Sequence, residues 1–237
     1  MSGQAQKGTG QTPGGPIRAC VFDAYGTLFD LSTACARLRA QLQEREKPLA
    51  ALWRDKQVQY SWWRTLQGRH VDFEGVTRDA LAHALDALHL DVGLEAALMA
   101  AFNALEAYPE VPGVLRRLRA MGLTTAILSN GSPSMLAALV QNAGIGALLD
   151  HVLSVEDVGV FKPDPRVYEL AVERLGVPAQ QISFQSSNAW DAHAAASFGM
   201  RVVWCNRQGQ AVERLPGRPA FTVASLQELP ELLAHGA

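Results

Sequence analysis

The stretch from Ile17 to Leu28, IRACVFDAYGTL, joins an apolar run to a carboxylate and a tight polar turn. Far downstream, ISFQ at 182–185 leads in the same way into SSNAWD at 186–191. Short apolar runs that end in turn residues are typical of buried parallel strands. Open α/β sheets bind ligands beyond the carboxyl ends of their strands. Asp23 therefore stands where a nucleophile is expected, although on its own it is equally well interpreted as a helix cap.

The rest of the chain divides into a helical block and an alternating block. After the first strand, apolar residues recur at three- and four-residue spacing, which predicts helices over 31–43, 48–66, 77–90 and 94–107. From residue 109 onward, strands and helices alternate. We expect strands at 123–128, 152–155, 182–185 and 201–204, and helices at 114–121, 133–142, 166–175 and 189–198, with a capping box at 225–228 opening a last helix.

This alternation predicts an α/β fold in which helices cover both faces of a Rossmann-like parallel sheet core. The helical block is then an inserted helical cap domain. We expect a catalytic core of residues 17–31 plus 109–237 and a cap of residues 32–108. Residues 1–16 are rich in Gly, Gln and Pro and contain no apolar core, which indicates a disordered tail and not a secretory signal.

Composition excludes several classes of function. The 237 residues carry a net charge of −2 and are 48% hydrophobic, as is ordinary for a globular protein, and no Lys/Arg cluster predicts nucleic-acid binding. No apolar run approaches the roughly 20 residues that a membrane-spanning helix needs. Cys20, Cys35 and Cys205 are far apart and odd in number, which favours free thiols in a reducing cytoplasm over a disulfide, metal or catalytic role.

Three polar segments carry candidate chemistry. Beside Asp23, a glycine three residues on permits a tight turn, and the Thr27 hydroxyl can donate to the carboxylate and hold its rotamer. Ser129 and Asn130 precede an expected helix N-terminus, which suits an anion, although Ser-Asn-Gly is also ordinary turn chemistry. Lys162 lies in a proline-flanked loop and can neutralise buried carboxylates, but a loop lysine is more often found on the surface.

Five motifs taken together resemble those of the haloacid dehalogenase superfamily, and within it those of the type II L-2-haloacid dehalogenases. The resemblance extends from Ile17 to about Leu233. Each motif is modest alone, but five in the right order are specific. They are DAYGTL at 23–28, WRDKQV at 53–58, LSNGS at 128–132, KPDPRVY at 162–168 and SSNAWD at 186–191.

The resemblance implies that halide is displaced at carbon. Asp23 would attack the α-carbon of a small L-2-haloacid from the side opposite the halogen, giving an ester with inverted configuration. Arg54 together with Asn130 matches the family's halide site, and because Arg54 lies on an expected cap helix, the cap would close over the substrate. Outside this context, a solvated helix arginine is the simpler interpretation.

The same resemblance assigns residues that hold the substrate. Ser129 and the backbone amides at Ala24 and Tyr25 would bind the substrate carboxylate and so orient the line of attack. Tyr25, Val58 and Trp190 would form the wall of an apolar pocket. Val58 and Trp190 are also compatible with simple packing in the core.

Hydrolysis of the ester would release a D-2-hydroxy acid and regenerate the enzyme. By resemblance, Asp191 polarises a water toward the ester carbonyl, and Ser186 and Asn188 position that water and that carboxylate. Lys162 would pair with both catalytic carboxylates and keep them ionised despite burial. Tyr168 matches a family tyrosine that hydrogen-bonds to this network.

Three alternatives stay open. A Mg²⁺-dependent phosphatase of the same superfamily would carry a second Asp where this chain has Tyr25, and acidic ligands where it has Ser186 to Asn188, so we expect no metal and no other cofactor. A hydrolase that opens a strained ring is barely separated from a dehalogenase by these motifs. A non-catalytic binding protein would have no use for a buried nucleophile with a positioned water.

Departures from the family pattern are few. Phe161 stands where relatives usually have Tyr, Gln185 is a polar residue at the end of an apolar strand, and residues 69–76 diverge, which can alter the preferred substrate size. Similar proteins are commonly dimeric, and the aromatic-rich stretch Trp53–Trp63 is our candidate interface for a homodimer. The expected partner is a small 2-haloacid, with no nucleic acid and no membrane.

Overall fold

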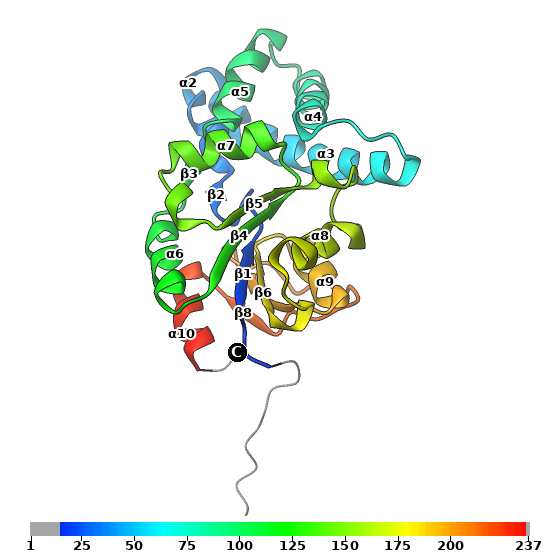
Figure 1. The fold of residues 1–237 in the computed structure, drawn as a ribbon. Coiled ribbons are helices and arrows are strands. Elements are labelled where there is room, and N and C mark those ends of the chain that lie inside the picture. Colours follow the sequence, from blue (N-terminus) through cyan, green and yellow to red (C-terminus); the bar gives the residue numbers. More distant parts are fainter. Residues whose placement is uncertain (1–14, 236–237) are drawn as a thin grey trace, which may run out of the picture.

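The computed structural model describes residues 15–235. Of the tail expected at residues 1–16, all but Gly15 and Pro16 lies outside these residues. The described chain forms a central sheet with helices on both of its faces and a helical block at one end (Figure 1).

Within residues 15–235, six strands form the central sheet in the order β5-β4-β1-β6-β7-β8, and every neighbouring pair is parallel. They are β1 (Ala19–Phe22), β4 (Thr124–Ser129), β5 (His151–Ser154), β6 (Ile182–Ser186), β7 (Arg201–Cys205) and β8 (Phe221–Val223). Phe22, the last residue of β1, lies opposite Ile127 in β4 and Gln185 in β6. The polar segments that follow these three strands therefore meet at one edge of the sheet.

In the same described residues, five α-helices belong to the alternating block: α6 (Val111–Ala120), α7 (Pro133–Asn142), α8 (Pro165–Leu175), α9 (Ala189–Phe198) and α10 (Leu229–Ala234). Figure 1 shows α6 and α10 on one side of the sheet and α8 and α9 on the other, as right-handed crossovers require. Local sequence starts two of them. Ser132 caps α7 by accepting from the Met135 N–H, and Asp164 caps α8 by accepting from the Arg166 N–H.

The block inserted after β1 is helical. Its described helices are α1 (Ser32–Ala36), α2 (Arg39–Leu42), α3 (Glu46–Gln67), α4 (Phe73–Ala87) and α5 (Glu95–Phe102). α3 packs against α4, with Trp53 buried on α3 and Val76 and Ala80 buried on α4, and the Trp53 indole donates to the Thr77 carbonyl at 2.9 Å. Two short antiparallel strands, β2 (Phe29–Asp30) and β3 (Glu106–Ala107), pair where the chain enters and leaves the block.

Short 3-10 turns complete the described elements. They are η1 (Gln43–Arg45), η2 (Val92–Leu94), η3 (Gly146–Leu148), η4 (Val155–Asp157), η5 (Ala179–Gln181) and η6 (Leu226–Glu228). The capping box expected at 225–228 is present, but it opens η6, and α10 follows directly.

Four expected helices have wrong ends, and the one expected at 114–121 begins three residues earlier, at Val111. The helix expected at 31–43 is broken into α1 and α2. The helix expected at 94–107 stops at Phe102, because the chain there turns to pair as β3, which satisfies its backbone groups in another way. The helix expected at 77–90 begins earlier, at Phe73, because Asp72 caps it by accepting from the Gly75 N–H at 2.7 Å. Strands β2, β3 and β8 were not expected.

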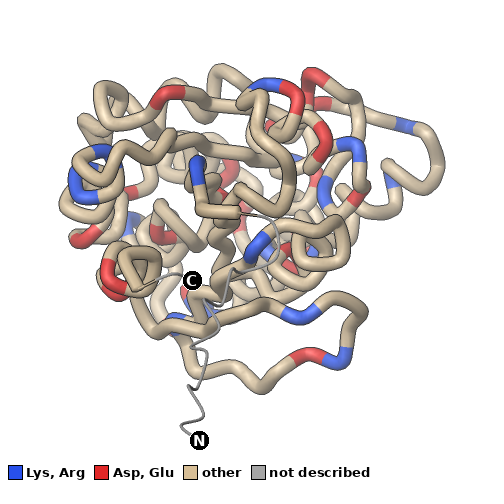
Figure 2. Tube along the Cα trace, turned by 60° about the horizontal axis from the view of Figure 1, so that its bottom comes forward, with Lys and Arg blue, Asp and Glu red and all other residues tan. Residues whose placement is uncertain are grey.

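Charged residues of both signs are interspersed along the chain (Figure 2), whose net charge is −2. Between residues 15 and 235, none of the helices combines the length and the apolar character that crossing a bilayer requires.

Candidate active site

Asp23 lies directly after β1, at the carboxyl edge of the sheet and at the point where the strand order reverses between β4 and β6. The turn that follows is closed by the Ala24 carbonyl, which accepts from the Leu28 N–H at 3.0 Å. Gly26 has a φ of +84°, in the left-handed region that favours glycine. The turn brings the Thr27 side chain back to Asp23, so a four-residue spacing in sequence becomes a hydrogen bond.

Both carboxylate oxygens of Asp23 have donors. Oδ2 accepts from Thr27 Oγ1 at 3.0 Å and from Asn188 Nδ2 at 2.8 Å, and Oδ1 faces Lys162 Nζ at 3.2 Å. The Thr27 hydroxyl accepts from the Ser187 N–H at 2.8 Å, which leaves its proton for Asp23. These contacts hold the carboxylate in one orientation, as a nucleophile requires.

Asp23, Lys162 and Asp191 form a cluster that we call the carboxylate–lysine cluster. Lys162 Nζ lies 2.9 Å from Asp191 Oδ2 and 3.2 Å from Asp23 Oδ1. Burial alone would lower the pKa of Lys162, but the two carboxylates outweigh it and hold that pKa above its ordinary value. Asp23 is 6% exposed, whereas Lys162 and Asp191 are 1% and 0% exposed. Asp23 is therefore the most exposed of the three groups.

Asp191 lies in the first turn of α9 and has a second donor. The Tyr168 hydroxyl, from α8, donates to Asp191 Oδ1 at 2.7 Å. Burial raises the pKa of Asp191 above its ordinary value, and the Lys162 charge opposes that rise without cancelling it. A carboxylate with a raised pKa is a better general base than an ordinary one. Ser186, also buried, accepts from the Asn188 N–H at 3.1 Å and shapes the loop before α9.

Arg54 reaches from α3 of the inserted block to the sheet. Its Nη2 donates to Asn188 Oδ1 at 3.0 Å, and its Nη1 donates to Gln57 Oε1 at 2.6 Å. Because Asn188 also donates to Asp23, the guanidinium is one residue removed from the carboxylate. Burial lowers the pKa of Arg54, yet an arginine stays charged at any ordinary pH. Gln57 was not among the predicted site residues, and its sequence signal is a spacing of three residues from Arg54 on a helix.

Ser129 and Asn130 follow β4 and are both buried. Ser129 Oγ accepts from the Gly131 N–H at 3.1 Å. Asn130 Oδ1 accepts from the Lys162 backbone N–H at 3.0 Å, so Asn130 ties the lysine loop to the end of β4, a contact that the sequence did not indicate. A halide site shared by Arg54 and Asn130 stays a prediction, because the hydrogen bonds of the Arg54 guanidinium go to Gln57 and Asn188.

The Tyr25 ring lies at the contact between the inserted block and the core. It packs against Phe102 and Phe73, with ring centroids 5.2 and 5.6 Å away. Its hydroxyl is buried and has no hydrogen-bond partner within residues 15–235, and burial raises the pKa of Tyr25. A Cβ at Gly131 would lie 2.8 Å from this hydroxyl, so the close approach requires glycine there.

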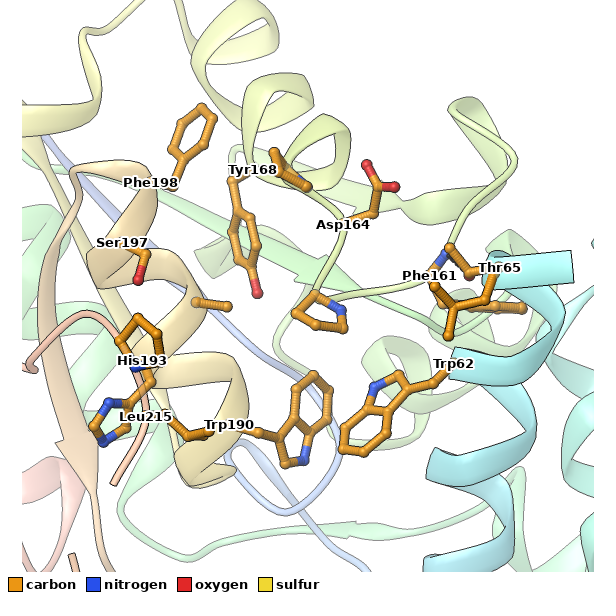
Figure 3. Close-up of a pocket in the computed structure, with 15 residues that line it drawn as sticks. Trp62, Thr65, Phe161, Asp164, Tyr168, Trp190, His193, Ser197, Phe198 and Leu215 are labelled. Atoms are coloured by element: carbon orange, nitrogen blue, oxygen red, sulfur yellow. Dashed lines mark hydrogen bonds between the residues drawn. The ribbon is translucent and has the colours of Figure 1, made fainter. Parts of the chain in front are cut away.

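An apolar pocket of about 840 Å³ lies between α3, α8 and α9 (Figure 3). Trp190 meets Trp62 edge to face there, with ring centroids 5.4 Å apart, and Tyr168 lines the pocket while its hydroxyl contacts Asp191. Val58 lies four residues after Arg54 on the same face of α3, outside the residues that line this pocket. The lining residues are Trp62, Thr65, Leu66, Phe161, Pro163, Asp164, Pro165, Tyr168, Trp190, His193, Ala194, Ser197, Phe198, Leu215 and Pro216.

The donor set around Asp23 does not fit a divalent cation. Asn188 Nδ2 donates both to Asp23 Oδ2 at 2.8 Å and to the Tyr25 carbonyl at 3.2 Å, so an amide NH₂ group bridges two oxygens that a magnesium ion would need as ligands. Within residues 15–235, no group of three or more His, Cys, Asp or Glu side chains is placed to hold a metal ion.

Comparisons with known proteins confirm the fold and the family that the five motifs predicted. The profile of the haloacid dehalogenase-like hydrolases matches residues 17–199. The chain is 43% identical over 220 residues to (S)-2-haloacid dehalogenase 1 of Pseudomonas sp. (strain CBS-3), covering 92% of this chain and 97% of that protein. A crystal structure of a dehalogenase superposes with a TM-score of 0.90 at 43% identity, covering 92% of this chain and 97% of that one.

The L-2-haloacid dehalogenase from Xanthobacter autotrophicus, solved with chloropropionic acid covalently bound, superposes with a TM-score of 0.87 at 38% identity. That alignment covers 93% of this chain and 100% of the other. The family profile spans more than half of this chain, and the relatives align over nearly their whole length. This chain therefore belongs to the haloacid dehalogenase-like hydrolases.

Proposed function

We propose that this protein is an (S)-2-haloacid dehalogenase, which hydrolyses small L-2-haloacids to D-2-hydroxy acids and halide through an ester on Asp23. The observation that carries the proposal is the carboxylate–lysine cluster: a carboxylate held by donors and 6% exposed stands beside a wholly buried one that can activate water. The named activity of the relatives supports the same assignment.

In the first step, a carboxylate oxygen of Asp23 forms a bond to the α-carbon as the carbon–halogen bond breaks and the halide leaves with both electrons. Ser129 and the backbone amides of Ala24 and Tyr25 bind the substrate carboxylate and orient the attack. The Arg54 guanidinium, held by its hydrogen bond to Asn188, would face the developing halide, where a fixed positive group stabilises the charge that forms in the transition state. Attack opposite the halogen inverts the configuration.

In the second step, water attacks the ester carbonyl of Asp23. Asp191 takes one proton from that water and returns it to the departing alkoxide, and the water's other proton passes to solvent as Asp23 regains its charge. Asn188 and Ser186 hold the loop at this position, and Lys162 and Tyr168 orient Asp191. No step in this sequence needs a metal ion.

Two rival activities make different predictions. A metal-dependent phosphatase would need a cation beside Asp23, where Asn188 Nδ2 bridges the carboxylate and the Tyr25 carbonyl. A hydrolase that opens a strained ring would use the same nucleophile and the same water, so only its substrate distinguishes it.

The test is halide release from L- and D-2-chloropropionate in the presence of EDTA, with p-nitrophenyl phosphate and Mg²⁺ as a parallel reaction. The proposal expects halide from the L-isomer alone, without metal. Phosphate release that requires Mg²⁺, with no halide from either isomer, would refute it in favour of a phosphatase. If neither halide nor phosphate were released, the proposal would be refuted in favour of ring opening or of binding without catalysis.

The proposal includes a homodimer in the cytoplasm with residues 32–108 as the cap. Trp63 and Leu66 are 49% and 84% exposed near the projecting end of α3, an apolar surface that suits a second copy of the chain (Figure 1). A monomer mass in solution scattering would refute the dimer. Cys20, Cys35 and Cys205 are all free and buried, which supports a reducing compartment. The β2–β3 pairing at both ends of residues 32–108 supports the cap boundaries.

A further inference from the structure

Arg54 is held from inside the cap by a run of buried hydrogen bonds. Its Nη1 donates to Gln57 Oε1 at 2.6 Å, and Gln57 Nε2 donates to Thr77 Oγ1 at 2.7 Å. Thr77 Oγ1 then donates to the Phe73 carbonyl at 2.6 Å. Gln57 and Thr77 are 1% and 0% exposed. We call this run the Gln57–Thr77 relay, and it ties α3 to α4 behind the guanidinium.

The direction of every bond in the relay is fixed by chemistry. A carbonyl can only accept, so the Thr77 hydroxyl must give its proton to Phe73 and can only accept from Gln57. The Gln57 NH₂ group therefore faces Thr77, and its amide oxygen faces Arg54. A guanidinium only donates, so this is the one amide orientation that satisfies both ends. The Thr77 hydroxyl and the Arg54 guanidinium thus require the same orientation of the Gln57 amide.

The relay also places no charge of its own against Arg54, which feels the Asp23 and Asp191 carboxylates without a hydrogen bond to either. The two hydrogen bonds of the guanidinium go to neutral amide oxygens, one on Gln57 and one on Asn188. A carboxylate at either place would form an ion pair with Arg54 and offset its charge before a substrate arrives. Held at both Nη atoms by neutral partners, Arg54 stays fixed and positively charged beside the residue that donates to Asp23.

We propose that Gln57 and Thr77 are positioning residues for departure of the halide: through the relay they fix the Arg54 guanidinium where the leaving group separates from carbon. This inference rests on the proposed dehalogenase function. It predicts that damage to the relay slows the first step and spares hydrolysis of the ester. It also predicts a larger effect on chloride, which is a poorer leaving group than bromide and depends more on stabilisation of its charge.

The test uses Thr77→Val, which keeps the branched shape and removes the hydroxyl, with Thr77→Ser as the conservative variant that retains it. Ser61→Ala is the matched control, because Ser61 is a buried hydroxyl on α3 that donates only to its own helix, at Val58 O. For each variant, kcat/KM is measured on L-2-chloropropionate and L-2-bromopropionate. The rate of ester hydrolysis is measured separately in single-turnover experiments.

For Thr77→Val we expect kcat/KM on the chloro substrate to fall about 10- to 100-fold, the size of effect that a misplaced group near the reaction produces, with a smaller fall on the bromo substrate and no change in ester hydrolysis. Thr77→Ser and Ser61→Ala should stay within about twofold of the wild type on both substrates. A further variant, Gln57→Glu, should weaken inhibition by added chloride because its carboxylate offsets the Arg54 charge.

Three results would each overturn the inference, since a structural defect predicts all of them. They are an equal loss of kcat/KM on the chloro and bromo substrates, an equally slowed ester hydrolysis, and a Thr77→Ser variant as poor as Thr77→Val. If the wild type released no halide at all, the proposed function would fail instead. Crystal structures of the wild type and Thr77→Val would test the relay directly. The inference predicts that the Arg54 guanidinium moves away from Gln57 in Thr77→Val, and an unmoved guanidinium would overturn the inference.

Discussion

Replacing Lys162 with methionine isolates what one buried charge does for the carboxylate–lysine cluster. Its Nζ lies 3.2 Å from Asp23 Oδ1 and 2.9 Å from Asp191 Oδ2. At an effective dielectric constant of about 20, each contact represents about 5 kcal/mol of attraction before desolvation is counted. Because removal of one partner from a buried ion pair costs about 3–5 kcal/mol net, we expect Lys162→Met to lower the free energy of unfolding by that amount near neutral pH.

The pH dependence of this loss has a definite sign. Burial already raises the pKa of Asp191, and the Lys162 charge opposes that rise. Without Lys162 the pKa of Asp191 rises further, and its ionised form is penalised in the folded state. The penalty is present above the raised pKa and shrinks as the pH falls from it toward the ordinary value of 3.8, because the folded protein then protonates Asp191.

The assay is urea unfolding of the wild type and Lys162→Met at about pH 7.5 and about pH 5, with Lys162→Met/Asp191→Asn as a rescue variant. Lys56→Met is the matched control, since Lys56 is part-buried on α3, where its Nζ donates to Gln59 at 3.1 Å and lies 5.8 Å from the Trp63 ring. We expect the control to change stability by less than about 1 kcal/mol. A loss below about 1 kcal/mol for Lys162→Met, or an equal loss at both pH values, would refute the assigned electrostatics.

Three further predictions concern single contacts. Tyr168→Phe removes a 2.7 Å donor from Asp191 and should slow ester hydrolysis about 10-fold and move its acid limb to higher pH, as single-turnover rates across pH would show. Arg54→Lys replaces a guanidinium that donates through both Nη atoms with a single ammonium. It should lower kcat/KM on L-2-chloropropionate about 100-fold, with an unchanged circular dichroism spectrum. Gly131→Ala, which brings a Cβ within 2.8 Å of a buried tyrosine hydroxyl, should cost about 1–3 kcal/mol in thermal unfolding, whereas Gly113→Ala, with open space, should cost nothing.

Elements with strong local signals were predictable. The helices expected at 133–142 and 189–198 have those bounds in the structure. The two-residue strands β2 and β3 could not be predicted, because each exists only through its pairing with the other, far along the chain. β8 has three residues at a sheet edge, which is too short for a periodicity to appear.

The site also contains residues that the sequence could predict and one that it could not. Asp23 and Asp191 follow strand ends, so the topology of a parallel sheet brings them together, and the motifs around Lys162 and Tyr168 indicated the rest of the cluster. Gln57 could not be found in this way, since its contact with Thr77 depends on how α3 and α4 pack. Its hydrogen bonds exist only once two helices have set their relative position.

The most direct test of the account asks which atom receives oxygen from water. Excess enzyme is given L-2-chloropropionate in ¹⁸O-labelled water for a single turnover, and the product and the proteolytic peptides are weighed by mass spectrometry. If Asp23 forms the ester and water attacks its carbonyl, the label enters the peptide that contains Asp23, the hydroxy acid carries none, and Asp23→Asn takes up no label. Label in the hydroxy acid of the first turnover, with an unlabelled Asp23 peptide, would mean that water attacks the substrate carbon and would contradict the account.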